Sequence, residues 1–170
     1  FTYTVNDGDT DSAPAMVTVT VTTNQAPVIG QSGPLPVSMD EDGSPTGFVA
    51  PTISATDAEG DSLTWDLALA ASDGTATVTG TGANPAITYA PDQNFVGSDS
   101  FDVRVSDATG SATITVNVTV DAVNDVPVAN DDSGTVAEGG IVTIDLTGND
   151  SDAEGSALTL NLGTATNGTL

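Results

Sequence analysis

Residues 101–120 read Phe-Asp-Val-Arg-Val-Ser-Asp-Ala-Thr-Gly-Ser-Ala-Thr-Ile-Thr-Val-Asn-Val-Thr-Val, and this stretch decides the fold. Apolar residues occupy every second position in both halves, which is the period of a β-strand with one buried face. The Ser-Asp-Ala-Thr-Gly segment between the halves has the composition of a turn. The stretch therefore predicts two strands joined by a short connection.

The same succession of strand, turn and strand occurs about a hundred residues earlier. Residues 1–5 alternate apolar and polar side chains, an Asp- and Gly-rich turn follows, and residues 17–21 alternate Val and Thr. Both copies end in Asn-x-x-Pro, at residues 24–27 and 124–127. Self-similarity at a fixed period indicates tandem copies of one domain.

A short acidic stretch is also repeated in the chain. Asp57-Ala58-Glu59-Gly60 recurs as Asp152-Ala153-Glu154-Gly155, and each copy is soon followed by Leu-Thr. Asp and Gly suit turns, whereas the following residues suit strands. The sequence therefore predicts a carboxylate-bearing loop at the same place in each copy.

The residues between the two matching hairpins predict several further short strands. Pro34 and Pro36 favour an edge strand, and residues 48–55 suggest a short strand interrupted by Pro51. Leu63, Trp65, Leu67 and Leu69 are expected on one face of a third strand. About seven short strands with regular turns and no helical periodicity predict an all-β antiparallel sandwich.

The repeats divide the chain into three copies. We expect the last two strands of one repeat at residues 1–23 and a linker at residues 24–27. A complete repeat follows at residues 28–120, and then a second linker at residues 121–127. The first strands of a further repeat are expected at residues 128–170. In the third copy, residues 167–169 match residues 73–75.

The outer copies leave apolar strand faces and edges unpaired, which two arrangements explain. The sequence is either a window of a longer array, or residues 1–23 of one chain complete residues 128–170 of an identical chain by strand addition. The first arrangement is favoured, because the two pieces together lack a counterpart of residues 87–97.

The charge balance excludes two classes of partner. The chain has one basic residue, Arg104, against 24 acidic residues, for a net charge of −23. Nucleic acids and anionic membrane surfaces require clustered Lys and Arg, so neither is expected to bind. A hydrophobic content of 38% is sufficient for a core, and the sequence contains no apolar run of about 18 residues that would insert in a membrane.

The missing residue types restrict the chemistry. Without His, Cys or Lys, the chain lacks the usual general bases, thiol nucleophiles, Schiff-base lysines and zinc ligands. No catalytic residues are therefore expected. The remaining carboxylates favour hard cations such as calcium, which would also relieve the repulsion among the acidic groups.

Four segments, at residues 57–64, 89–101, 105–107 and 121–127, resemble in their order and spacing the bacterial cadherin-like tandem repeats of very large surface adhesins and other extracellular proteins. The resemblance implies tandem immunoglobulin/cadherin-like repeats of about 95–100 residues, export to the cell exterior, and calcium at the junctions between repeats. It does not identify the adhesion ligand.

The junction after the complete repeat is the stronger candidate calcium site. The segment Asp121-Ala-Val-Asn124-Asp125 resembles the calcium linker of cadherins, and residues 150–155 place acids at alternate positions before a glycine. Calcium needs six to eight oxygen ligands, which loops from two repeats and a linker can supply together. The candidate ligands are Glu41, Asp99, Asp121, Asn124, Asp125, Asp150, Asp152 and Glu154.

The junction before the complete repeat departs from this pattern. Asp57, Glu59 and Asp107 are candidate ligands there, but Gln25 occupies the position of Asp125 and the linker is one residue shorter. We therefore expect weaker calcium binding, or none, and a looser joint. A separate acidic cluster is expected at Asp7, Asp9 and Asp11.

Three functions are compatible with these features. The first is a non-catalytic, extracellular spacer of an adhesin, whose partners are neighbouring repeats and whose junctions are stiffened by calcium. The second is a filament subunit completed by strand exchange between identical chains. The third, a glycan-binding or glycosidase module, is disfavoured because aromatic residues make up only 4% of the chain and Trp65 is expected in the core.

Overall fold

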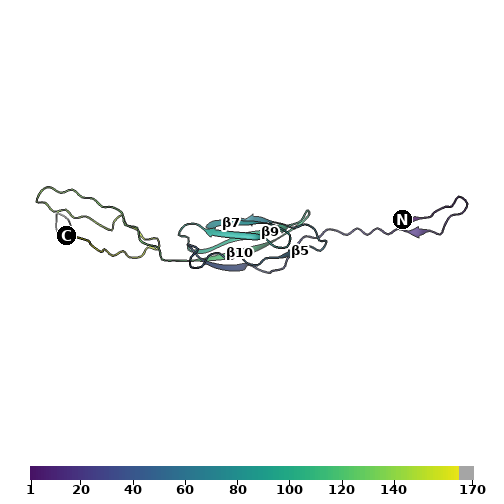
Figure 1. Cartoon of the computed structure of the whole chain (residues 1–170), viewed down its shortest axis with the longest axis horizontal. Helices are drawn as coiled ribbons and strands as arrows, with labels where there is room; N and C mark the ends of the chain where they lie inside the picture. Colours follow the sequence, from purple (N-terminus) through teal and green to yellow (C-terminus); the bar gives the residue numbers. More distant parts are fainter. Residues whose placement is uncertain (165–170) are drawn as a thin grey trace.

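The structure is a computed structural model, which describes residues 1–164 of the chain. All regular elements in this range are strands, so none of the described residues form a helix that could cross a membrane. A central sandwich carries an extended segment at each end (Figure 1). The strands are β1 (Thr2–Tyr3), β2 (Ala15–Met16), β3 (Val28–Ile29), β4 (Leu35–Asp40), β5 (Ala55–Thr56), β6 (Thr64–Leu69), β7 (Gly74–Thr81), β8 (Ala86–Pro91), β9 (Gly97–Ser106) and β10 (Ser111–Asp121).

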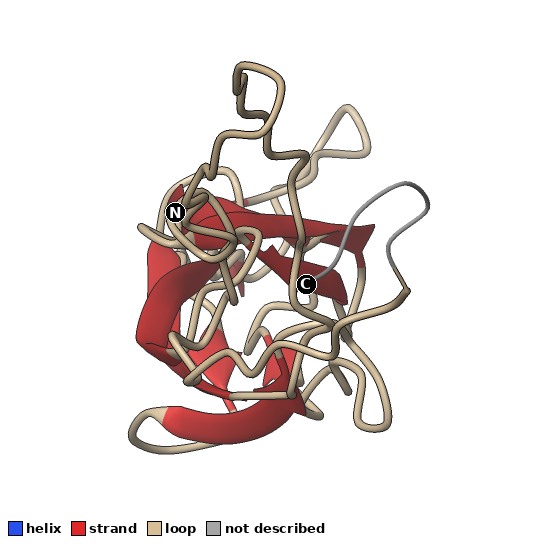
Figure 2. Ribbon diagram, turned by 90° about the vertical axis from the view of Figure 1, so that its left-hand side faces the viewer, coloured by secondary structure: helices blue, strands red, loops and turns tan. Residues whose placement is uncertain are grey.

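The central sandwich has two layers around one core. Its main sheet has the order β4-β10-β9-β6-β7-β8, and its first four strands form one layer. β6 and β7 pair at only two positions. Beyond these positions β7 and β8 form the second layer on the opposite side of the core, with β3 and β5 beside them. Viewed along the long axis, the strands curve around a common centre (Figure 2). This arrangement confirms the predicted all-β, immunoglobulin-like fold.

The hairpin of β9 and β10 supplies much of the core. The two strands pair in antiparallel register from Ser111 opposite Ser106 to Val120 opposite Gly97. Phe101, Val103 and Val105 have no exposed surface, as the alternation predicts. The ring of Phe101 stacks on that of Tyr89 from β8, with centroids 5.9 Å apart, so the hairpin joins the two layers.

β4 occupies the edge of the main sheet, as its prolines predict. It pairs with β10 in parallel, from Leu35 opposite Val116 to Asp40 opposite Asp121. A proline has no N–H to donate to a further strand, so Pro36 is compatible only with an edge. The pairing brings the end of β4 beside the end of β10, where the chain leaves the sandwich.

The predicted apolar face of β6 forms only in part. Leu63 and Trp65 are buried, and the Trp65 indole N–H donates to the carbonyl oxygen of Gly82 at 2.8 Å, so its assignment to the core is correct. Leu67 is partly buried, but Leu69 is 58% exposed. The pairing of β6 with β9 shifts register between Leu67 and Leu69, and such an irregularity turns the following side chain away from its expected face.

Three stretches in which the sequence predicts strands differ from the structure. Residues 48–54 contain no strand, and only Ala55–Thr56 pairs, because Pro51 interrupts the run. The second strand of the first copy lies at Ala15–Met16 rather than at residues 17–21. Residues 128–164 form no strand beyond an isolated pairing of Val128 with Ser151.

The segment after the second linker, residues 128–164 (the third segment), lacks a partner for its apolar residues. Ile141 is 95% exposed, whereas the apolar residues of the central sandwich face β9 and β10. Within residues 128–164, no strands occupy the place of β9 and β10, so the alternation of apolar residues has no layer to pack against. The predicted match at residues 167–169 lies outside the described residues.

Candidate metal centre at the junction

Three carboxylates from distant parts of the sequence converge where the chain leaves the sandwich. Glu41 follows β4, Asp125 lies in the linker after β10, and Glu154 lies in the acidic loop of the third segment. One oxygen of each lies within 4.8 Å of the others. We refer to these three residues as the junction cluster.

Backbone hydrogen bonds hold the junction cluster together. The Glu41 N–H donates to the carbonyl oxygen of Asp121 at 3.0 Å, and Oε1 of Glu41 accepts from the N–H of Val123 at 3.0 Å. The Asp125 N–H donates to Oε2 of Glu154 at 3.1 Å. The linker is therefore bonded to both the sandwich and the third segment, and a carboxylate makes each side-chain contact.

The junction cluster is electrostatically unfavourable without a cation. Desolvation raises the pKa of Asp125 above its usual value, and the charges of Asp42, Glu154, Glu41 and Asp152 raise it further. Like charges at short range disfavour ionisation of one another. A divalent cation would reverse this penalty, because it attracts every carboxylate at once.

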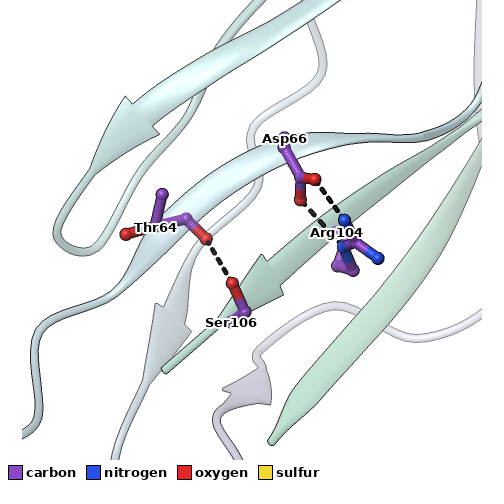
Figure 3. A network of polar contacts seen from close by, with 4 residues as sticks. All are labelled: Thr64, Asp66, Arg104 and Ser106. Carbon is purple, nitrogen blue, oxygen red and sulfur yellow. Dashed lines mark hydrogen bonds and ion pairs between the residues drawn. The ribbon is translucent and has the colours of Figure 1, made fainter. Parts of the chain in front are cut away.

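The single basic side chain lies elsewhere and does not neutralise the cluster. Arg104 on β9 forms a two-pronged ion pair with Asp66 on β6, on the outer face of the sheet (Figure 3). The Ser106 hydroxyl donates to the carbonyl oxygen of Thr64 beside it at 3.5 Å. The guanidinium hydrogen bond lowers the pKa of Asp66. Because Arg104 alternates with the buried Val103 and Val105, its side chain lies on the solvent-facing side of β9.

Asp42 and Asn94 also line the junction, although neither was among the candidate ligands. A cavity of about 360 Å³ lies beside Asp125 and Asp152 and is bordered by both residues. Asn94 has a φ of 58°, the only positive φ of a non-glycine in residues 1–164. Both residues lie in turns that the sequence composition indicates, Asp-Gly at residues 42–43 and Pro-Asp-Gln-Asn at residues 91–94.

The other candidate ligands at this junction lie outside the cluster. The Asn124 side chain donates to the carbonyl oxygen of Asp125 at 2.8 Å, and Asp121 contributes its backbone oxygen to Glu41. Asp152 accepts from the N–H of Ser156 at 2.8 Å. Asp150 accepts from the N–H of Asn130 at 2.8 Å.

Asp99 has a structural environment instead. It is 7% exposed, and its carboxylate accepts hydrogen bonds from the N–H groups of Ser72, Asp73 and Ser100 and from the Tyr89 hydroxyl. Burial acts to raise the pKa of Asp99, but these hydrogen bonds outweigh it and the pKa lies below its usual value. The side chain ties the turn before β7 to β9, and it is not part of the junction cluster.

The acidic loops at the opposite end of the sandwich meet the linker that precedes it. Oδ1 of Asp57 accepts from the N–H groups of Glu59 and Asp61, each at 3.0 Å. Its Oδ2 is buried and has no hydrogen-bond partner within residues 1–164. Oε2 of Glu59 accepts from the N–H of Gln25 at 3.1 Å, and Asp107 accepts from the Asn24 side chain at 3.0 Å.

The separate acidic cluster in the first segment, residues 1–23, is a hydrogen-bonded turn. Oδ1 of Asp7 accepts from the N–H groups of Asp9 and Thr10, at 3.0 Å and 2.9 Å, and these bonds lower the pKa of Asp7. Asp11 accepts from the Asn6 side chain at 2.7 Å. The carboxylates of Asp7 and Asp11 thus stabilise the connection between β1 and β2.

The donor atoms at both ends of the sandwich suit a hard cation such as calcium. All charged donors are carboxylates, and calcium accepts six to eight oxygen ligands in flexible geometry. The junction cluster supplies three carboxylates, and the buried, unpartnered Oδ2 of Asp57 is a polar atom that a cation would satisfy. The residues present therefore fit a calcium ion.

Comparison with known proteins gives one family match. A family model described as a bacterial Ig domain matches residues 24–119 and again residues 124–170. No curated protein matches the sequence at a significant level. Among solved structures, the chain is similar to an endo-fucoidan hydrolase from glycoside hydrolase family 107, with 28% identity, 72% of this chain and 18% of that chain covered, and a TM-score of 0.42. The chain thus spans less than a fifth of that hydrolase, and a similarity of this extent supports no functional argument.

Proposed function

Because the chain belongs to the bacterial Ig domain family, we propose that it is a spacer of a surface or secreted adhesin whose junctions are stiffened by calcium. The family is a non-catalytic, structural one, and its domains are typically repeats of surface or secreted proteins. The proposed repeats are residues 1–23, 28–120 and 128–170, joined by linkers at 24–27 and 121–127. Each repeat has its neighbours in the same chain as partners.

The convergence of Glu41, Asp125 and Glu154 carries this proposal. The three carboxylates come from the sandwich, the linker and the third segment, so a single ion bound to them would join all three. When bound, calcium would supply positive charge at the point where the three segments meet. The residues would bind the ion, and the backbone bonds of Val123 and Asp125 would orient the linker around it.

The junction before the sandwich is proposed as a weaker site. Asp57 offers a buried oxygen, but Gln25 stands where Asp125 stands at the other junction, so one carboxylate is replaced by an amide. Calcium affinity depends on the number of charged ligands. Occupancy is therefore expected first at the junction cluster.

Calorimetric titration of the whole chain with calcium tests the proposal. Asp125→Asn is expected to weaken the tightest binding by at least about tenfold, because it removes one charged ligand. Asp132→Asn makes the same change of charge at an exposed acid outside the cluster and is the matched control. In the unsubstituted chain, calcium is expected to raise the unfolding temperature as ligand linkage requires. Equal affinities for the two variants, or an unchanged unfolding temperature, would contradict the proposal.

A second candidate function is assembly of identical chains by strand exchange. Phe1 and Val21 are 79% and 86% exposed, although their counterparts Phe101 and Val120 are buried in the central sandwich. Residues 1–23 of one chain would offer residues 128–170 of another the strands that β9 and β10 supply in the central sandwich. Light scattering after size-exclusion chromatography distinguishes the functions: polymers that grow with concentration favour exchange, and a monodisperse monomer eliminates it.

A further inference from the structure

The linker that precedes the sandwich lies directly against two of its loops. The Asn24 side-chain amide donates to Oδ2 of Asp107 at 3.0 Å and also to the hydroxyl of Thr109. The N–H of Gln25, the next residue, donates to Oε2 of Glu59 at 3.1 Å. Both loops therefore bind the linker through groups that need no metal between them.

Asp107 is fixed in position before it meets the linker. Its Oδ1 accepts from the N–H groups of Thr109 and Gly110, each at 2.6 Å, and these bonds lower its pKa. The backbone N–H of Asp107 donates in turn to the carbonyl oxygen of Gly110 at 3.1 Å. One carboxylate oxygen thus orders the turn, while the other is directed at Asn24.

Ala26 packs directly onto Gly110. A Cβ added at Gly110 would lie 2.5 Å from the Cβ of Ala26 and 2.9 Å from its Cα, distances that atoms cannot adopt without displacement. Gly110 is not among the glycines with positive φ, so its backbone conformation is open to other residues. Close approach of the linker is the reason for glycine here. Pro27, which follows, is buried and anchors the linker at the sandwich.

We propose that the loops at residues 57–61 and 107–110 form a docking surface for the linker of the preceding repeat, and that this joint persists without metal. It therefore differs from the junction cluster, where three carboxylates meet and a cation would be needed to relieve their repulsion. The surface fits a linker that has an amide side chain at the position of Asn24 and a small residue at the position of Ala26. The residue between them can be of any type. Removal of calcium would loosen one end of the sandwich and leave the other fixed.

Amide hydrogen exchange, followed by NMR on the whole chain in EDTA and in calcium, tests the proposal. The amide of Gln25 is expected to exchange at least about tenfold more slowly than in an unstructured peptide in both conditions, because its hydrogen bond to Glu59 does not involve the ion. Protection of Gln25 only in calcium would overturn the proposal. The amides of Val123 and Asp125 report separately on the junction cluster: their failure to respond to calcium would contradict the proposed calcium function and leave the docking surface intact.

Substitutions at the contact give an independent test. Gly110→Ala is expected to abolish the protection of Gln25, and adding Ala26→Gly is expected to restore it in part, because the new methyl group then meets only the backbone of residue 26, at 2.9 Å. The indole N–H resonance of Trp65, which depends on its bond to Gly82, shows whether each variant is folded. Asn24→Ala leaves the sandwich unchanged and is expected to reduce the protection of Gln25 at least about fivefold, because the hydrogen bonds from Asn24 to Asp107 and Thr109 are lost. Unchanged protection in both Gly110→Ala and Asn24→Ala would overturn the proposal.

Discussion

The hydroxyl of Tyr89 on β8 donates a hydrogen bond of 2.9 Å to Oδ2 of Asp99 on β9, across the interior of the sandwich. Burial, followed by the hydrogen bond to Asp99 and the charge of that carboxylate, raises the pKa of Tyr89 above its usual value. The phenol therefore remains protonated and continues to donate over the ordinary pH range. This contact links the two layers at the end of the sandwich nearest the junction cluster.

Removal of the Asp99 carboxylate is expected to destabilise the fold more than removal of the Tyr89 hydroxyl. Asp99→Ala leaves three backbone N–H groups without their acceptor, and we expect a loss of about 3 kcal/mol in the free energy of unfolding. Tyr89→Phe removes one hydrogen bond and is expected to lose about 1 kcal/mol. Urea unfolding measures both values, and equal losses would show that the backbone contacts contribute little.

Stability is expected to fall in acid partly through Asp99. The pKa of Asp99 is lower in the folded chain than in the unfolded chain, where it is about 3.9. The contribution of Asp99 to the free energy of unfolding is therefore complete above the unfolded-state pKa, and it is lost as the pH falls through the folded-state pKa. Asp99→Asn removes this dependence but retains the other acids. The free energies of unfolding of the unsubstituted chain and of the Asp99→Asn variant are expected to converge between about pH 4 and pH 2. A constant difference across this range would exclude Asp99 as a source of the acid sensitivity.

Gly74 is expected to tolerate no side chain. A Cβ there would lie 2.6 Å from the carbonyl oxygen of Ala90 and 2.7 Å from the Tyr89 hydroxyl. Gly74→Ala should therefore lower the free energy of unfolding by about 1–3 kcal/mol, the usual result of overpacking. Gly163→Ala is the matched control, since no atom of residues 1–164 lies within 4 Å of its added Cβ. Similar unfolding midpoints for the two variants would contradict the steric argument.

The ion pair between Arg104 and Asp66 is expected to contribute little to stability. Their side chains are 43% and 44% exposed, and exposed pairs are weakened by solvent and salt. Arg104→Gln should leave the unfolding temperature nearly unchanged at physiological salt. A large decrease, maintained in high salt, would mean that the pair is worth more than its exposure indicates.

Trypsin is expected to cut the chain at one place, and only when the sandwich opens. Arg104 is the single basic residue of the sequence and lies within β9, between two neighbouring strands. A strand paired on both sides cannot enter a protease active site, so cleavage should follow the population of the open state. Mass spectrometry should detect fragments 1–104 and 105–170 in urea and the intact chain without it. Rapid cleavage under native conditions would contradict the pairing of β9.

The sequence predicted the sandwich well where one face of a strand is buried. In residues 101–120 a period of two leaves a single register that buries every apolar side chain, so the pattern alone identifies the hairpin. The pattern was less informative for Leu69, because a register shift changes the face without changing the sequence period. It failed for residues 128–164, where alternation is present but no second layer covers it.

The candidate site was predictable residue by residue only in part. Glu41, Asp125 and Glu154 were identified through repeated turns and a linker pattern, and the structure brings them together. Asp99 was assigned to the same junction, although it shares the phase of the buried residues Phe101 and Val103, a signal of an inward side chain. The packing of Ala26 on Gly110 had no signal, because close approach across 84 residues leaves no local pattern.

The parallel pairing of β4 with β10 has a mechanical consequence. These are the first long strand and the last strand of the sandwich, and they pair in parallel from Leu35 opposite Val116 to Asp40 opposite Asp121. Tension applied along the chain pulls the start of β4 and the end of β10 in opposite directions, parallel to both strands. The ladder is then loaded in shear, so its hydrogen bonds must break together instead of one after another. A repeat built in this way would keep its length under a pull that would unzip a hairpin.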